Sequence, residues 1–140
     1  MLWFDKTFDE LTVHELYAIT VLRERVFVVE QACAYLDADG YDQRSRHLWG
    51  GDFQAYLRIV PAGLKFPELS IGRVIVAPEA RGSGLGYELM QRGIAACGGV
   101  AIRLGAQAHL EKFYGSLGFS RASDVYDEDG IPHVEMLRAG

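Results

Sequence analysis

A glycine-rich loop between a predicted strand and a predicted helix constrains this 140-residue chain more than any other feature. Residues 69–77 are β-branched or apolar, as in a central strand, and Pro78 bounds them. Residues 100–105 predict the next strand, and strands joined through one helix are expected to be parallel, with a right-handed crossover. This strand–helix–strand unit indicates an α/β fold. Its helix has one apolar stripe, formed by Gly86, Leu89, Met90, Gly93, Ile94 and Cys97.

The loop itself predicts a site for a phosphate or a pyrophosphate. Amide groups at a helix N-terminus lack partners, and the helix dipole favours negative charge there. Residues without Cβ let the backbone approach a ligand, and Arg81 adds a charge-assisted contact. A dinucleotide fingerprint would need glycine at Tyr87 or Leu89, and a Walker loop needs Gly-Lys-Ser/Thr, so spacing excludes both. The loop reads Arg81-Gly82-Ser83-Gly84-Leu85-Gly86.

Strand and helix patterns alternate through the rest of the chain. A capping box of Thr12 and Glu15 starts a helix predicted over 13–30. Its first half has an apolar face with Val13, Leu16, Tyr17 and Thr20, and we expect its second half to be buried. Strands are further predicted over 2–8, over 53–60 and on both sides of a turn at Asp129-Gly130, and a helix is predicted around Leu110, Phe113, Tyr114 and Leu117, with Gly118 at its end.

Length and composition narrow the possible functions. A chain of 140 residues fits one domain, residues 1–140. A net charge of −5 argues against a nucleic-acid partner, and no stretch approaches the roughly 20 apolar residues of a membrane helix. The N-terminus has no secretory pattern, so we expect a cytoplasmic protein. Cys33 and Cys97 are too few for a disulfide framework, and we predict no metal site.

The loop pattern Arg-x-x-Gly-x-Gly resembles the GNAT family of N-acetyltransferases, in which a Gln/Arg-x-x-Gly-x-Gly/Ala loop holds the coenzyme A pyrophosphate. The likeness includes the strand at 72–76, and residues 113–119 (Phe-Tyr-Gly-Ser-Leu-Gly-Phe) are similar to the family's second conserved block. Segments 27–31, 105–110 and 128–133 resemble the small bacterial ElaA-like branch. The resemblance implies the GNAT fold, a mixed and mostly antiparallel twisted sheet flanked by helices, with a central parallel strand pair.

The resemblance also implies acetyl-CoA as the cosubstrate. The pyrophosphate would bind to Arg81 and to the amides of the glycine loop, Gly82, Ser83, Gly84, Leu85 and Gly86. The pantetheine arm would pair as an added strand with the backbone of Val74, Ile75 and Val76, and Gln107, Phe113 and Tyr114 would flank the coenzyme.

The family's chemistry is direct attack of a neutral amine on the thioester in a ternary complex, with the oxyanion held by a backbone amide near Val76. The resemblance makes Tyr114 the acid that protonates the thiolate, although Tyr114 also fits a core aromatic residue. An ammonium acceptor needs a base, and the sequence does not choose among four candidates: Glu30, His47, His109 and His133.

The acceptor and the oligomeric state, a homodimer included, stay open at this point. A small amine and a protein amine are both compatible with the sequence. Two acidic loops could attract a cationic amine or could be solvated turns: Asp37, Asp39 and Asp42, and Asp124, Asp127, Glu128 and Asp129. The alternatives to an enzyme are a catalytically inactive acyl-CoA-binding sensor and an interaction domain without a cofactor.

Overall fold

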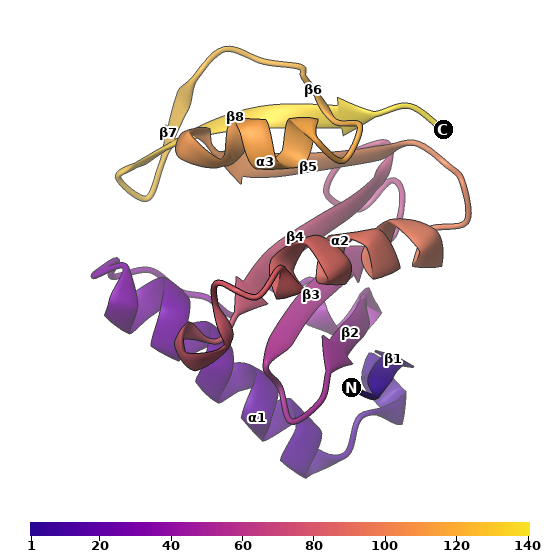
Figure 1. Ribbon diagram of the computed structural model, residues 1–140, viewed down its shortest axis with the longest axis vertical. Helices are drawn as coiled ribbons and strands as arrows, with labels where there is room; N and C mark the ends of the chain where they lie inside the picture. Colours follow the sequence, from indigo (N-terminus) through magenta and orange to yellow (C-terminus); the bar gives the residue numbers. More distant parts are fainter.

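The computed structural model describes residues 1–140, whose eight strands form one mixed sheet (Figure 1). The strand order is β1-β2-β3-β4-β5-β8-β6, and β7 pairs with β8. Only β4 and β5 are parallel; every other pair is antiparallel, as expected for the predicted fold class. The strands are β1 (Trp3–Thr7), β2 (Arg46–Gly50), β3 (Ala55–Val60), β4 (Leu69–Val76), β5 (Ile102–Gln107), β6 (Ser120–Arg121), β7 (Tyr126–Glu128) and β8 (Ile131–Arg138).

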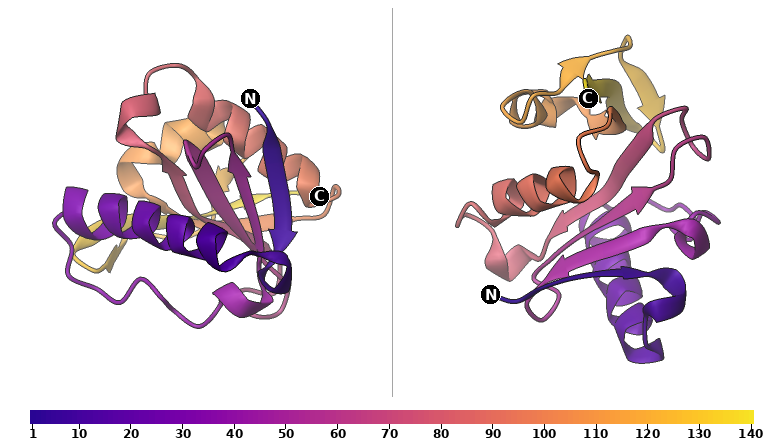
Figure 2. Two further views of the ribbon diagram at one scale, coloured as in Figure 1. Left: turned by 90° about the horizontal axis from the view of Figure 1, so that it is seen from below. Right: turned by 90° about the vertical axis from the view of Figure 1, so that its right-hand side faces the viewer.

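Helices cover both faces of the central strands. Figure 2 shows α1 (Val13–Arg23) and α2 (Leu85–Ala96) on opposite sides of β2 to β4. A π-helix, η2 (Glu24–Glu30), continues α1, and a short helix, α3 (Glu111–Gly115), follows β5. No helix combines the length and the apolar character that a membrane span requires. The remaining helical turns are η1 (Phe8–Glu10), η3 (Asp42–Arg44), η4 (Pro78–Ala80) and η5 (Ala108–Leu110).

Strand β3 is buried along its whole length because it contributes to two cores. Side chains of a strand alternate between its faces. Leu57 and Ile59 pack in the core below α2, which also holds Cys97, whereas Tyr56 packs in the core below α1. Burial on both faces explains why residues 53–60 read as a central strand from the sequence.

The prediction of which face of the first helix is buried is wrong. Val13 and Tyr17 are 78% and 73% exposed. The buried row of α1 and η2 is instead Ile19, Leu22, Arg23 and Val26, and the second half is not buried throughout, because Val29 is 73% exposed. The hydrophobic pattern did not identify this face because the row that faces the sheet contains a charged residue, Arg23. The burial of Arg23 depends on distant carboxylates.

The parallel pair β4 and β5 separates soon after it begins. Only Leu69 with Ile102 and Ser70 with Arg103 are in register, and Figure 1 shows the two strands diverging from there. On its other side β4 has a bulge, where the register with β3 shifts and Arg73 adopts φ +51°. The second half of β4 therefore has one edge without a strand partner.

Candidate active site

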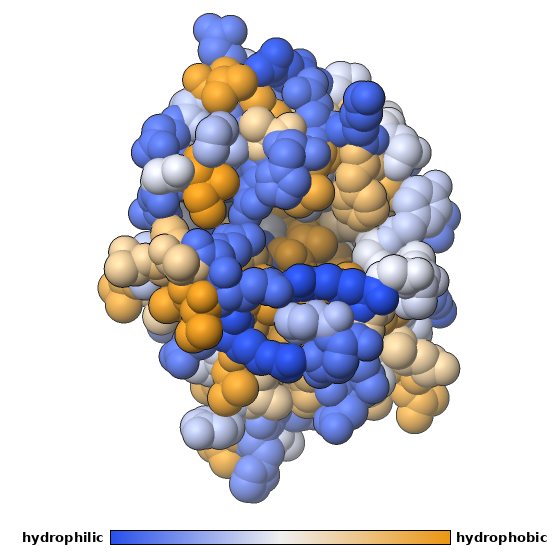
Figure 3. Space-filling view, turned by 60° about the vertical axis from the view of Figure 1, so that its left-hand side comes forward, coloured by the Kyte–Doolittle hydropathy of each residue, from blue (hydrophilic) through white to orange (hydrophobic).

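A cleft of about 480 Å³ opens where β4 and β5 separate. Gly72, Arg73 and Val74 form its β4 wall, and Gln107 and Tyr114 form its β5 and α3 wall. The segment after η2, the β3–β4 connection and the β7–β8 hairpin complete the cleft. On the face seen in Figure 3, a recessed hydrophobic area is bordered by hydrophilic residues. A ligand in the cleft could reach the free edge of β4 as well as side chains from the other walls.

The glycine loop lines a second hollow, of about 320 Å³, at the N-terminus of α2. Gly82 and Gly84 have φ angles of +85° and +78°, which side chains with a Cβ rarely adopt. A Cβ on either residue would meet no atom within 4 Å, so glycine is needed for the backbone angle and the space above the loop is free. Gly86 instead lies beside the side chains of Val76 and Phe113. The N-terminus of α2 thus borders an open hollow, as an anion site requires.

Arg81 and Glu30 are brought together by the fold. Arg81 donates two hydrogen bonds of 2.7 Å to the Glu30 carboxylate and a third, of 3.1 Å, to the Val76 carbonyl. The hydrogen bonds from Arg81 lower the pKa of Glu30. This pair links the end of η2 to the end of β4, and both oxygens of Glu30 are occupied, which argues against Glu30 as the base.

The surroundings of Tyr114 fit both roles considered for it, a core aromatic residue and a proton donor. Its ring is 6% exposed and packs edge-on against Phe113 and Phe119, with ring centroids 5.1 and 6.1 Å apart. Its hydroxyl has no hydrogen-bond partner in the protein, and the residue lines the cleft. Burial raises the pKa of Tyr114 to about 12. The hydroxyl therefore keeps its proton at neutral pH and is free to donate it.

His47 does not reach the cleft. It is fully buried on β2, where Nε2 lies 2.9 Å from the Asp42 carbonyl and Nδ1 lies 2.7 Å from the Tyr56 hydroxyl. A carbonyl only accepts, so Nε2 carries the proton and Nδ1 accepts from Tyr56. Burial also lowers the pKa of His47. Both nitrogens of His47 are hydrogen-bonded inside the core, so His47 has a structural role. His109 is exposed on η5 and does not line the cleft.

His133 lies in the cleft wall with one nitrogen available. Its Nδ1 lies 2.7 Å from the Ile131 carbonyl, so Nδ1 carries the proton of the neutral ring. Nε2 is then the basic nitrogen, 3.3 Å from a Glu128 carboxylate oxygen. The Tyr126 ring stacks on the imidazole with centroids 6.0 Å apart. Of the four candidate bases, His133 alone lies in the cleft lining.

The predicted coenzyme residues on β4 and β5 have different surroundings. The Ile75 side chain is buried below α1, so only its backbone is available at the strand edge, whereas Val74 lines the cleft. At the end of β5, the Gln107 amide donates to the Gln31 side chain at 3.3 Å. The Cys33 thiol donates to the Asp129 carbonyl at 3.3 Å. These two contacts hold the segment that follows η2 against the far wall of the cleft.

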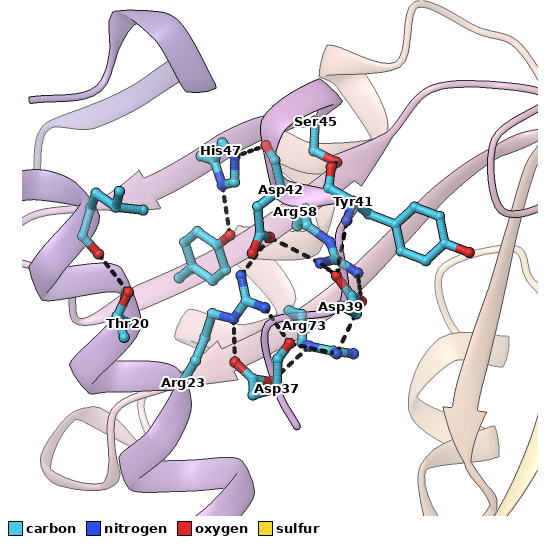
Figure 4. A network of polar contacts seen from close by, with 12 residues as sticks. Thr20, Arg23, Asp37, Asp39, Tyr41, Asp42, Ser45, His47, Arg58 and Arg73 are labelled. Carbon is cyan, nitrogen blue, oxygen red and sulfur yellow. Dashed lines mark hydrogen bonds and ion pairs between the residues drawn. The ribbon is translucent and has the colours of Figure 1, made fainter. Parts of the chain in front are cut away.

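The acidic residues at 37–42 are paired with arginines, which the sequence reading missed. Three arginines and three aspartates form one network of ion pairs (Figure 4). Arg58 donates two 2.8 Å hydrogen bonds to the Asp39 carboxylate. Arg23 lies 2.7 Å from Asp37 and 2.6 Å from Asp42, and Arg73 lies 2.9 Å from Asp37 and 3.1 Å from Asp39.

This network corrects the expectation for the first acidic loop. Three guanidinium groups balance the three carboxylates, so the loop is neither a solvated turn nor a free anionic surface. The residues of the second acidic loop have different roles. Asp127 accepts a hydrogen bond from the Gly130 amide and stabilises the turn, whereas Glu128 and Asp129 line the cleft. An arginine in the buried strand β3, Arg58, was the sequence signal that could have revealed the network.

Comparisons with known proteins agree with this geometry. A family model described as an acetyltransferase (GNAT) domain matches residues 57–138. Protein ElaA of Escherichia coli is 43% identical over 97% of this chain and 95% of its own length, and its crystal structure superposes with a TM-score of 0.90 over 98% of both chains. An acyl-CoA N-acyltransferase structure from Pseudomonas aeruginosa is 41% identical, with a TM-score of 0.92 over 99% of this chain and 100% of its own.

A more distant structure shares the fold. An aminoglycoside 6′-N-acetyltransferase complexed with coenzyme A has a TM-score of 0.69 at 15% identity, over 96% of both chains. The overall fold is therefore shared by proteins of very different sequence.

Proposed function

Since the chain belongs to the GNAT acetyltransferase family, we propose that it transfers an acetyl group from acetyl-CoA to a primary amine by direct attack in a ternary complex. One observation carries this proposal: the free edge of β4 joins a glycine loop with positive φ angles to a cleft that contains the Tyr114 hydroxyl. A cytoplasmic location is part of the proposal.

The coenzyme would occupy both hollows. Its pyrophosphate would accept hydrogen bonds from the amides of 82–86 at the start of α2. Its pantetheine arm would pair with the free edge of Val74, Ile75 and Val76 as a further strand does. Gln107 and Phe113 would then flank it from β5 and α3. Arg81 is already bonded to Glu30 and Val76, so it would contribute to the shape of the loop more than to the charge at the phosphates.

Three proton transfers accompany the chemistry. The amine nitrogen attacks the thioester carbonyl, the C–S bond breaks as the tetrahedral intermediate collapses, and an amide and a thiol leave. An amide N–H near Val76 would stabilise the oxyanion. Tyr114, protonated at neutral pH, would donate a proton to the thiolate sulfur, and its phenolate would then take the remaining extra proton from the nitrogen that becomes the amide. His133 Nε2 would take the proton of the incoming ammonium, and Glu128 would stabilise the resulting imidazolium.

Release of free thiol from acetyl-CoA in the presence of primary amines tests the proposed function. Thiol release that depends on one class of amine would support an acetyltransferase. Acetyl-CoA binding without thiol release for any small or protein amine would favour the inactive sensor. Absence of acetyl-CoA binding would favour an interaction domain.

Gly84→Asp is expected to weaken acetyl-CoA binding at least tenfold, because a carboxylate would stand where the pyrophosphate binds. Gly84→Asn is the matched control, since asparagine has the same shape and tolerates positive φ without adding charge. Calorimetry on both variants measures the difference. Equal affinities for the two variants would contradict a pyrophosphate site at this loop.

His133→Gln is expected to lower kcat about 100-fold and to remove the acidic limb of the pH–rate profile, since glutamine can still donate to Ile131 but cannot take a proton. His109→Gln, on the exposed turn η5, is the control and should leave the profile unchanged. An acidic limb that persists in His133→Gln would exclude His133 as the base.

A further inference from the structure

The cleft contains one cationic side chain that no carboxylate contacts as an ion pair. Lys65, on the connection between β3 and β4, lines the cleft, and its ammonium lies 5.8 Å from the centroid of the Phe66 ring without an ion pair. The other basic residue of the lining outside histidine, Arg73, is paired with Asp37 and Asp39. Lys65 is therefore the lining cation that is free to bind an anion from outside the protein.

Free negative charge lies on a different wall of the same cleft. Glu128 and Asp129 belong to the β7–β8 hairpin, and Glu128 faces His133 at 3.3 Å. The hairpin carboxylates and His133 suit an ammonium group, whereas Lys65 suits an anion. Apolar lining from Phe66 and Ile131 accompanies these charged groups and would accommodate a short carbon chain between them.

The surroundings of Lys65 favour a bound anion. Desolvation by the cleft walls, and after it the positive charge of Arg73, lower the pKa of Lys65. The charges of Glu128 and Asp39 act in the opposite direction, and Lys65 is exposed, so an anion from solvent can reach its ammonium. A second ammonium at this position would instead be repelled.

We propose that the acceptor is a zwitterion of the amino-acid type, whose carboxylate binds Lys65 while its amine approaches His133 and the thioester. A carboxylate matches the site better than a phosphate, because the guanidinium forks that favour phosphate are engaged in the aspartate network. This inference rests on the proposed function, since it assigns the acceptor of the same cleft.

Three amines of equal length test the inference: 5-aminopentanoate, pentylamine and 1,5-diaminopentane. Their amines have similar basicity, so differences in kcat/KM report the group at the far end. We expect the native protein to prefer 5-aminopentanoate over pentylamine by about fivefold, the size of a partly exposed ion pair. Lys65→Met should abolish this preference, and Lys65→Glu should reverse it in favour of the diamine.

Binding of the same three amines to the protein saturated with coenzyme A, measured by calorimetry, separates this inference from the proposed function. A Lys65-dependent preference in binding without any thiol release would support the zwitterion site and contradict the acetyltransferase. The preference among the three amines could instead be the same in the native protein, Lys65→Met and Lys65→Glu, whether measured by thiol release or by binding. That result would overturn the zwitterion site and leave the acetyltransferase in place.

Discussion

Tyr114→Phe is expected to lower kcat about 100-fold while acetyl-CoA affinity stays within about twofold of the native value. General acids contribute factors of about this size, and the substitution removes only the proton donor. The aromatic ring would stay in its contacts with Phe113 and Phe119, and the hydroxyl has no protein partner to lose, so we expect the free energy of unfolding to change little.

The pH dependence distinguishes Tyr114 from His133. Because burial raises the pKa of Tyr114 to about 12, the hydroxyl is protonated at every pH at which the protein would normally be assayed. The loss of activity in Tyr114→Phe should therefore be uniform from about pH 6 to 10. Tyr126→Phe removes another hydroxyl from the same cleft and serves as the control. Unaltered kcat in Tyr114→Phe would remove this residue from the mechanism.

Arg58→Met is expected to lower the free energy of unfolding by about 3–5 kcal/mol, the usual cost of leaving buried charges without their partner. Arg58 is 1% exposed and bonds to both Asp39 and Asp42. Such a loss is a large part of the 5–15 kcal/mol that stabilises a typical domain. Equilibrium unfolding in urea, followed by circular dichroism, measures it.

The matched control is Arg25→Met. Arg25 also pairs with a carboxylate, that of Glu79, but both side chains are largely exposed, so we expect a change within about 1 kcal/mol. If the two variants lost similar small amounts of stability, the buried network would not stabilise the fold in the way its geometry suggests.

Acid should weaken the network in a defined range of pH. Burial alone would raise the pKa of Asp39, but the hydrogen bonds from Arg58 and the charges of Arg58 and Arg73 lower it from 3.8 to about 2. A carboxylate with a lowered pKa stabilises the native state above the unfolded value and loses that contribution as pH falls towards the folded value. Between about pH 4 and pH 2 the native protein should lose about 2 kcal/mol from this group, and Arg58→Met should lose less.

The network also determines the shape of the cleft. Asp37, Asp39 and Asp42 fix the segment after η2 to three separate elements, and this segment carries Tyr35 and Leu36 into the cleft wall. Arg73 is at once the bulged residue of β4 and a partner of Asp37 and Asp39. The strand edge proposed to bind pantetheine and the wall proposed to face the acceptor are thus joined by one set of ion pairs.

The sequence by itself determined the features that depend on neighbouring residues. Alternating and helical patterns identified β3, β4, α2 and the parallel unit, and Gly82 and Gly84 marked a loop whose backbone a ligand can approach, where the structure has positive φ angles. The hairpin turn at Asp129-Gly130 followed from the same local preference. Periodicity and φ preference are properties of a few adjacent residues, so they can be read without knowing the fold.

The tertiary structure decided what depends on contacts between distant residues. Strand β2 was not predicted, because a short segment with Arg46 and His47 becomes a strand only between β1 and β3. Arg23 is buried only because Asp37 and Asp42 reach it from 14 and 19 residues away. His47 and His133 are equivalent in the sequence, yet strand register places one in the core below α1 and the other opposite Gln107 at the open end of β5. Burial and hydrogen-bond partners come from that register, and they determine which histidine is able to take up a proton.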